Sequence, residues 1–161
     1  MMNIKYGYLL IFVCISLASC SRRTTSAYYK WETIFIKSAD NGSEVYKHFA
    51  VGSNKSESVS QSEIDVLKEI IFKGVASAPN PRPLVYDVNA EEKYRNYFES
   101  FFKEGGDYIK YVELYRNGNL NNSDRIKTGK RHDRKMKGME ITVKKASLRK
   151  TLENANIISV N

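Results

Sequence analysis

Apolar residues recur along this chain with two spacings, one typical of strands and one of helices. Alternation of apolar and polar positions predicts β-strands at residues 31–37, 44–51, 108–115 and 139–144. A spacing of three or four predicts helices at residues 64–75, 90–103 and 147–155. The pattern indicates an α+β fold, with a single mixed or antiparallel sheet and two to three helices packed on one face.

Turn and cap residues predict where these elements begin and end. Asp40-Asn41-Gly42 predicts a turn that joins the first two strands as a hairpin. The polar residues 53–60 predict a loop, and Gly74 predicts the end of the first helix. The prolines of residues 79–83 exclude helix there, before a short extended run. N-caps are expected from two residues, Asn89 and Ser147.

Two of these segments carry apolar residues in an unusual arrangement. The strand at 108–115 has apolar residues on both faces, which is typical of a central strand. The helix at 90–103 carries an aromatic stripe, for which we expect a core position, with a sugar- or lipid-contacting surface as the alternative. In the helix at 64–75 we expect four polar residues to face away from the apolar stripe: Glu63, Asp65, Lys68 and Glu69.

The N-terminal apolar run differs from both patterns. Residues 8–17 are uncharged and follow Lys5. This run is about half of the ~20 residues that a membrane-spanning helix needs. Small residues and Cys20 follow the run, so we predict a secretory signal at residues 1–19. An ordinary signal peptide or a short membrane anchor is the alternative.

Leu17-Ala18-Ser19-Cys20 resembles the lipobox of bacterial lipoproteins. This resemblance implies that Cys20 carries acyl chains such as palmitate and becomes the mature N-terminus. We therefore expect a lipidated tether at residues 20–29 and a single α+β domain at 30–161. Ser21 is compatible with outer-membrane sorting in such proteins, so we expect a lipid anchor in the outer membrane, with the protein facing the periplasm. The mature chain would then have no second cysteine for a disulfide.

Positive charge is concentrated in one part of the chain. Residues 124–150 contain eleven Lys or Arg and three Asp or Glu, a net charge of +8. Without residues 1–19 the whole chain has 25 basic and 18 acidic residues, or +7, so the remainder is about −1. Two interpretations of this concentration of charge remain open: a solvated loop, and a loop that contacts an anionic partner. The basic residues of the predicted loop are Arg125, Lys127, Lys130, Arg131, Arg134, Lys135 and Lys137.

No residue pattern indicates catalysis, a metal site or a cofactor. His48 and His132 lack the spacing of a metal motif. The serines of residues 53–62 contain no GxSxG elbow. Thr128-Gly129-Lys130 lacks the first glycine of a phosphate-binding loop, because Asp124 stands in its place.

Two further segments resemble known envelope proteins. They are Ile71-Phe72-Lys73-Gly74-Val75, with the aromatic pairs at 97–98 and 101–102, and Gly138–Val143 leading into Leu148–Glu153 and Ile157-Ile158. Together with the lipobox they resemble small uncharacterised lipoproteins of Bacteroidetes. The ending is similar to α+β domains of envelope proteins related to flagellar assembly lipoproteins. The resemblance implies an assembly or structural role and assigns no catalytic residue.

The sequence thus favours a lipid-anchored, non-enzymatic envelope protein that is a structural or assembly component of a membrane-associated complex, such as a secretion apparatus. The alternative is a binding module for anionic glycan or lipid headgroups. Expected partners are the membrane, through the lipid, and an envelope protein or anionic polymer. Nucleic acid is the usual partner of a basic cytosolic protein, but an exported lipoprotein seldom meets it, so we do not expect it here.

Overall fold

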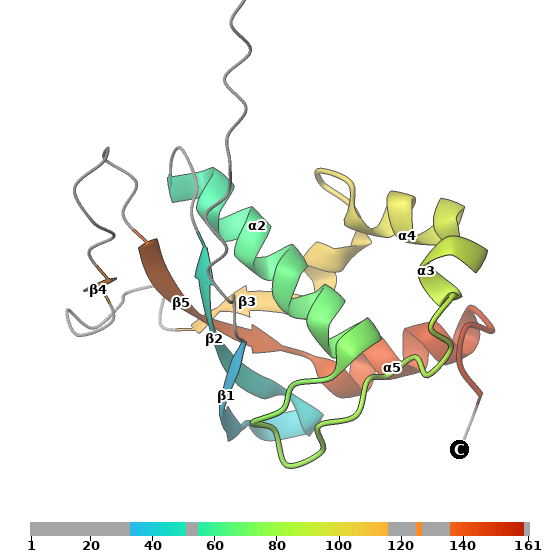
Figure 1. Cartoon of the computed structure of the whole chain (residues 1–161), viewed down its shortest axis with the longest axis horizontal. Coiled ribbons are helices and arrows are strands. Elements are labelled where there is room, and N and C mark those ends of the chain that lie inside the picture. The colour runs from blue at the N-terminus through green and yellow to red at the C-terminus, as the bar shows by residue number, and fades with distance from the viewer. Residues whose placement is uncertain (1–32, 51–54, 116–124, 127–135, 160–161) are drawn as a thin grey trace, which may run out of the picture. The chain divides into compact units, whose positions relative to one another are not determined.

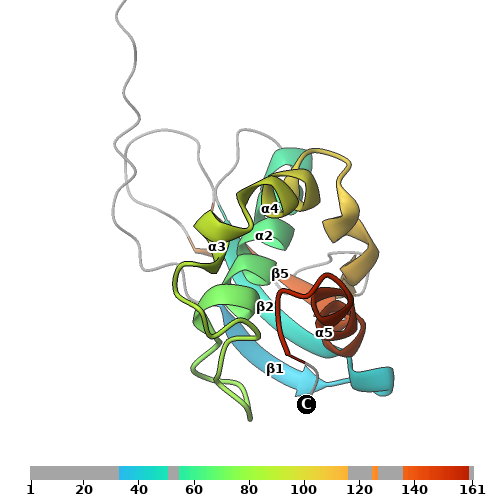
Figure 2. The same ribbon diagram turned by 90° about the vertical axis from the view of Figure 1, so that its right-hand side faces the viewer.

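An antiparallel sheet with helices on one side forms the fold (Figures 1 and 2). The computed structural model describes residues 33–50, 55–115, 125–126 and 136–159. Its strands are β1 (Ile34–Ser38), β2 (Glu44–Ala50), β3 (Val112–Leu114), β4 (Arg125–Ile126) and β5 (Met136–Val143). The strand order is β1-β2-β5-β3, and β4 also pairs with β5. The expected α+β class is confirmed, and the sheet is antiparallel at every described pairing.

The helical segments follow the strands in an order close to the predicted one. The α-helices are α2 (Lys55–Lys68), α3 (Ala90–Lys93), α4 (Arg95–Phe102) and α5 (Lys145–Asn154). Short 3-10 helices are η1 (Asp40–Gly42) and η3 (Asp107–Tyr111), and η2 (Glu69–Lys73) is a π-helix that continues α2. Among the described residues no helix is both long and apolar enough to span a bilayer.

The strand register determines which side chains form the core. Tyr46 pairs with Ile141 and His48 pairs with Met139, so these four residues share one face of the sheet. This face is covered by α2, and all four side chains are buried. Leu148 and Leu152 of α5 join the same apolar cluster. The predicted turn at 40–42 is confirmed, with positive φ at Asn41 and Gly42.

The first helix is longer than expected. The prediction of a loop at 53–60 is wrong from Lys55 onward, because α2 begins there. Ser58, Ser62 and Val66 are spaced four apart and are all buried. The serines therefore lie on the helix face that packs inward, where a small side chain fits closely.

The end of this helix is determined by Gly74, as predicted. Gly74 has φ +78°, and a Cβ there would collide with the carbonyl oxygen of Pro81. The connector that follows is not helical. Its backbone N–H groups at Leu84 and Val85 donate to the carbonyls of Ile70 and Ile71 at 3.1 and 2.9 Å. The connector thereby satisfies carbonyls that the end of the helix leaves free.

The predicted second helix is present in two pieces. α3 and α4 are separated at Tyr94, and Asn89 makes no side-chain capping bond. The aromatic stripe lies in the core, as expected: Phe98 and Phe101 are buried, and Phe98 contacts Phe72 of η2 edge-on at 4.8 Å between centroids. Three half-buried aromatic side chains pack against the same cluster: Tyr94, Tyr97 and Phe102.

Three predictions near the C-terminal half are wrong. Residues 107–111 form η3 rather than strand, and β3 lies at an edge of the sheet rather than in its centre. Tyr108 is buried and Tyr111 stacks on Phe101, and their spacing of three places both on one face of the 3-10 helix. Ser147 is not a cap, because α5 begins at Lys145.

Candidate functional site

The structure places only the base of the predicted basic loop. Arg125 of β4 pairs with Lys137 of β5, and Ile126 pairs with Met136, so the two ends of the basic stretch pair as antiparallel strands. The strand β4 was not predicted, because two residues are too few to show alternation. The other predicted binding residues lie outside the described residues: Lys127, Lys130, Arg131, Arg134 and Lys135. We call residues 125–137 the basic hairpin; it contains seven Lys or Arg and one acid, Asp133.

The basic hairpin leaves the sheet at the end where the chain enters the domain. Lys137 pairs with Ala50, the last residue of β2. Thr33, which precedes β1, bonds to His48, only two residues before Ala50 in β2. The predicted lipid attachment at Cys20 lies outside the described residues, thirteen residues before Thr33. An extended chain of that length reaches at most about 45 Å.

Three of the four basic residues that follow the hairpin up to Lys150 have acidic partners. Lys144 pairs with Glu113, Lys145 lies 3.0 Å from Glu44, and Arg149 lies 3.9 Å from Glu153. Glu44 also accepts a hydrogen bond from Tyr46, and burial together with this carboxylate raises the pKa of Tyr46. These bases contribute to the fold of α5 and the sheet. The unbalanced charge of residues 124–150 therefore belongs mainly to the basic hairpin.

His48 lies in a buried polar cluster rather than in an open site. Its Nδ1 is 3.0 Å from Thr33 Oγ1, and its Nε2 is 3.7 Å from Asp65 Oδ2. Thr33 donates to Glu69 of η2. His48 is only 2% exposed, so a substrate has no access to its ring in this geometry. The other histidine, His132, lies outside the described residues.

Sequence reasoning missed the partners of His48. Asp65 and Glu69 were expected to face away from the packed side, but both reach the Thr33 end of the sheet. Asp65 and Glu69 are four residues apart, and Asp65 follows the buried Ser62 by three, so all three lie on one face of the helix. This spacing is the sequence signal that could have placed both carboxylates near the packed side. Within the described ranges no three His, Cys, Asp or Glu side chains are grouped as metal ligands.

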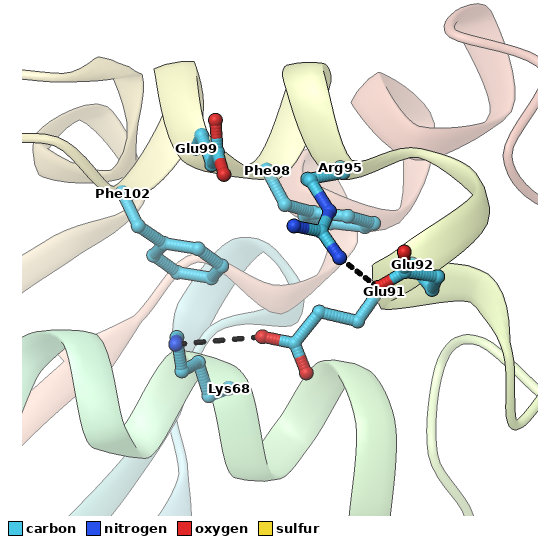
Figure 3. Close-up of a pocket in the computed structure, with 7 residues that line it drawn as sticks. All are labelled: Lys68, Glu91, Glu92, Arg95, Phe98, Glu99 and Phe102. Atoms are coloured by element: carbon cyan, nitrogen blue, oxygen red, sulfur yellow. Dashed lines mark hydrogen bonds and ion pairs between the residues drawn. The ribbon is translucent and has the colours of Figure 1, made fainter.

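A cleft of about 300 Å³ lies between α2 and the α3–α4 segment (Figure 3). Four of its five charged side chains form two pairs: Lys68 lies 3.5 Å from Glu91, and Arg95 donates to Glu92, which raises the pKa of Arg95. Lys68 also lies over the ring of Phe102, 5.4 Å from its centroid. With Glu99 as the fifth, the cleft has a net charge of −1 beside two phenylalanine rings, Phe98 and Phe102. It has no nucleophile or acid–base pair.

Comparisons of the chain with protein-family models, with curated proteins and with solved structures give no match. Family membership therefore contributes nothing to the assignment of a site.

Proposed function

We propose that this protein is a lipid-anchored, non-enzymatic component of the bacterial outer membrane that faces the periplasm. Its domain acts in the assembly or structure of a membrane-associated complex, and the basic hairpin binds an acidic component of that complex. The observation that carries the proposal is the concentration of charge. The basic hairpin has a net charge of +6, whereas the rest of the mature chain is close to neutral.

Like charges held together on a hairpin repel one another, and a hairpin built this way contributes little to an apolar core. An anionic partner offsets that repulsion and is attracted over roughly a Debye length, about 8 Å at physiological ionic strength. The neighbouring bases Lys144 and Lys145 have carboxylate partners from other elements. Within residues 125–137 the sequence itself provides one acid, Asp133, for seven bases, and this imbalance favours a contact function for the hairpin.

The second candidate function is binding of anionic lipid or glycan headgroups. It is favoured by the common position of Thr33 and the hairpin base at one end of the sheet. A lipid at Cys20 would tether that end of the domain to the membrane. Each Lys or Arg near an anionic surface contributes about 1 kcal/mol, and salt weakens the attraction.

A pull-down from the protein's own envelope in mild detergent tests the first candidate. We expect a defined set of membrane proteins to co-purify with the lipidated protein, and to be lost from a variant in which four hairpin bases become serine: Lys130, Arg131, Arg134 and Lys135. A matched control removes four exposed bases elsewhere: Lys73, Arg82, Lys93 and Lys103. Equal recovery of partners by both variants would exclude the role of the hairpin.

Flotation with lipid vesicles tests the second candidate. The same protein is mixed with anionic or zwitterionic vesicles, so that the difference reports on headgroup charge rather than on the anchor. We expect the preference for anionic vesicles to disappear at high salt and in the hairpin variant, but not in the control. No preference at low salt would remove this candidate and leave the assembly role.

A further inference from the structure

The side of the sheet that faces away from the helices carries exposed apolar side chains (Figure 2). Phe35 packs against the core cluster, so its neighbour Ile34 points to the opposite side, where its partner on β2 is Lys47. Ile34 is 40% exposed, and Ile36 on the same edge strand is exposed to the same extent. We call this side of the sheet the outer face.

An aromatic ring continues the apolar surface on the next strand. Phe49 follows Lys47 by two residues on β2, so both side chains lie on the outer face. A Cβ on Gly138, the partner of Phe49 on β5, would lie 2.7 Å from the phenyl ring. The half-buried ring therefore lies over this glycine. We call Ile34, Lys47 and Phe49 the outer patch.

A bridge between two side chains crosses the rest of the outer face. Lys37 Nζ donates to the hydroxyl of Tyr115 at 2.8 Å and lies 4.8 Å from the centroid of its ring. Lys37 is on β1 and Tyr115 follows β3, so β2 and β5 lie between them. Three strand spacings are about 14 Å, which the two side chains span only when they lie flat along the face. Val45 pairs with Lys37 and is fully buried, as expected beneath such a bridge.

The outer face thus combines apolar and amphipathic side chains. A lysine stem and a tyrosine ring each carry a polar tip on an apolar body, and such side chains are favoured where lipid meets water. Along the described strands Glu140 lies opposite Lys47, and Glu113 pairs with Lys144. With Lys37 the face therefore has three bases and two acids, so its charge does not repel an anionic surface.

Two observations indicate that a lipid bilayer meets this face. Ile34 follows the predicted lipid attachment at Cys20 by fourteen residues, so an anchored domain holds this side chain within about 50 Å of the membrane. Such a tether makes even a weak contact intramolecular. The strand pair after Phe49 and Gly138 joins Ala50 to Lys137, so the basic hairpin leaves the sheet beside the outer patch. Its charge complements an anionic bilayer.

We propose that the outer face is a docking surface for an anionic phospholipid bilayer, with Ile34 and Phe49 entering the headgroup boundary. The inference rests on the lipid anchor of the proposed function and goes beyond it by stating which side of the domain meets the membrane. The helices, and the cleft between α2 and the α3–α4 segment, then face away from the bilayer and are accessible to a partner.

Nitroxide labels on single cysteines test this proposal. In the anchored protein Cys20 is blocked by lipid and Cys14 is removed with the signal, so an introduced cysteine is the one free thiol. Ile34→Cys places a label in the outer patch. Val88→Cys is the control, because Val88 is apolar and 94% exposed and lies two residues before α3. Each lipidated protein is added to preformed vesicles of zwitterionic and anionic phospholipid, and its intact mass is measured.

The collisions of each label with two quenchers report its surroundings: oxygen, which concentrates in bilayers, and a water-soluble nickel chelate. Relative to position 88, we expect the label at 34 to gain collisions with oxygen and to lose collisions with the chelate several-fold. If the protein is acylated and the two labels behave alike, the docking proposal is overturned and the anchor stands. Loss of both kinds of collision at 34 would show that protein, such as a second copy, covers the outer patch, which also overturns it. A protein without acyl groups would overturn the anchor and this inference with it.

Discussion

The packed centre of the domain and the basic hairpin are opposites in composition and in contacts. In the centre, α2, η2 and α4 bring together aliphatic and aromatic side chains, such as Ile71, Phe72 and Phe98, over the face of the sheet. The basic hairpin has seven Lys or Arg and one acid within thirteen residues. Among the described residues, the two regions are joined along β5, through the short β4, and by the pairing of Lys137 with Ala50 of β2.

This difference leads us to expect that the packed centre determines the stability of the fold and that the basic hairpin determines the proposed binding. Burial of apolar surface stabilises the centre, at about 25 cal/mol per Å², and involves none of the hairpin's charge. Charge on the hairpin acts at a distance and depends on salt. Substitutions in the packed centre should therefore lower the free energy of unfolding, whereas substitutions in the hairpin should leave it nearly unchanged. Four experiments compare these effects.

The largest effect is expected in the centre. Ile71 is fully buried, and Ile71→Ala removes buried methyl groups and leaves a cavity, so the free energy of unfolding should fall by about 4 kcal/mol. Ile109→Ala is the matched control, because Ile109 is 51% exposed and should lose under about 1 kcal/mol. Urea unfolding measures both. Equal losses would mean that the centre does not hold the fold.

The next effect is expected at the turn that leads into the connector. Gly74→Ala forces a Cβ against the carbonyl oxygen of Pro81 and strains a positive φ, which should cost about 3 kcal/mol. Gly105 also has a positive φ, +70°, but no atom within 4 Å of an added Cβ. Gly105→Ala should therefore cost only about 1 kcal/mol. If the two substitutions cost the same, the close approach at Pro81 contributes nothing.

A smaller effect on stability is expected from the hairpin. Replacing Lys130, Arg131, Arg134 and Lys135 with serine should change the free energy of unfolding by less than about 0.5 kcal/mol, since no contact described for the packed centre involves these bases. A slight gain at low salt would be consistent with relief of repulsion. A loss of several kcal/mol would show that the two regions are not separable.

The smallest effect on the free energy of unfolding is expected at Glu63, a half-buried residue of α2. Burial raises the pKa of this carboxyl, so its ionisation weakens the fold as the pH rises through that pKa. Glu63→Gln should therefore stabilise the protein at neutral pH by a few tenths of a kcal/mol, after allowance for solvent screening. The gain should vanish in acid, where the wild-type carboxyl is protonated. A loss at neutral pH would contradict this.

Local chemistry explains which parts of the fold could be predicted. Asp40-Asn41-Gly42 forms the turn because its residues tolerate positive φ, and Met139, Ile141 and Val143 alternate because one side of β5 faces the helices. The helix at 55–60 was missed because serine favours loops in isolation and only packing makes its inward face visible. Residues 107–111 were assigned to a strand because aromatic and branched residues are dense over this short run, although Tyr108 and Tyr111 lie three apart, which fits a 3-10 helix.

The candidate sites differ in the same way. The basic residues are adjacent in the sequence, so their concentration is visible without a structure. The buried polar cluster around His48 joins residues up to 36 positions apart, and neither histidine spacing nor helix pattern pairs Thr33 with Glu69. Such a cluster depends on the packing of α2 against β2, which sequence spacing does not encode.

The account depends most on the protein being held at a membrane, since the compartment decides which anion the hairpin meets. The most direct measurement is the intact mass of the protein isolated from the cell envelope, beside Cys20→Ala. We expect a mature chain that begins at Cys20 and carries two or three acyl chains, and no acylated product from Cys20→Ala. A mature chain without acyl groups, or one that retains residues 1–19, would contradict the account and return nucleic acid to the candidate partners.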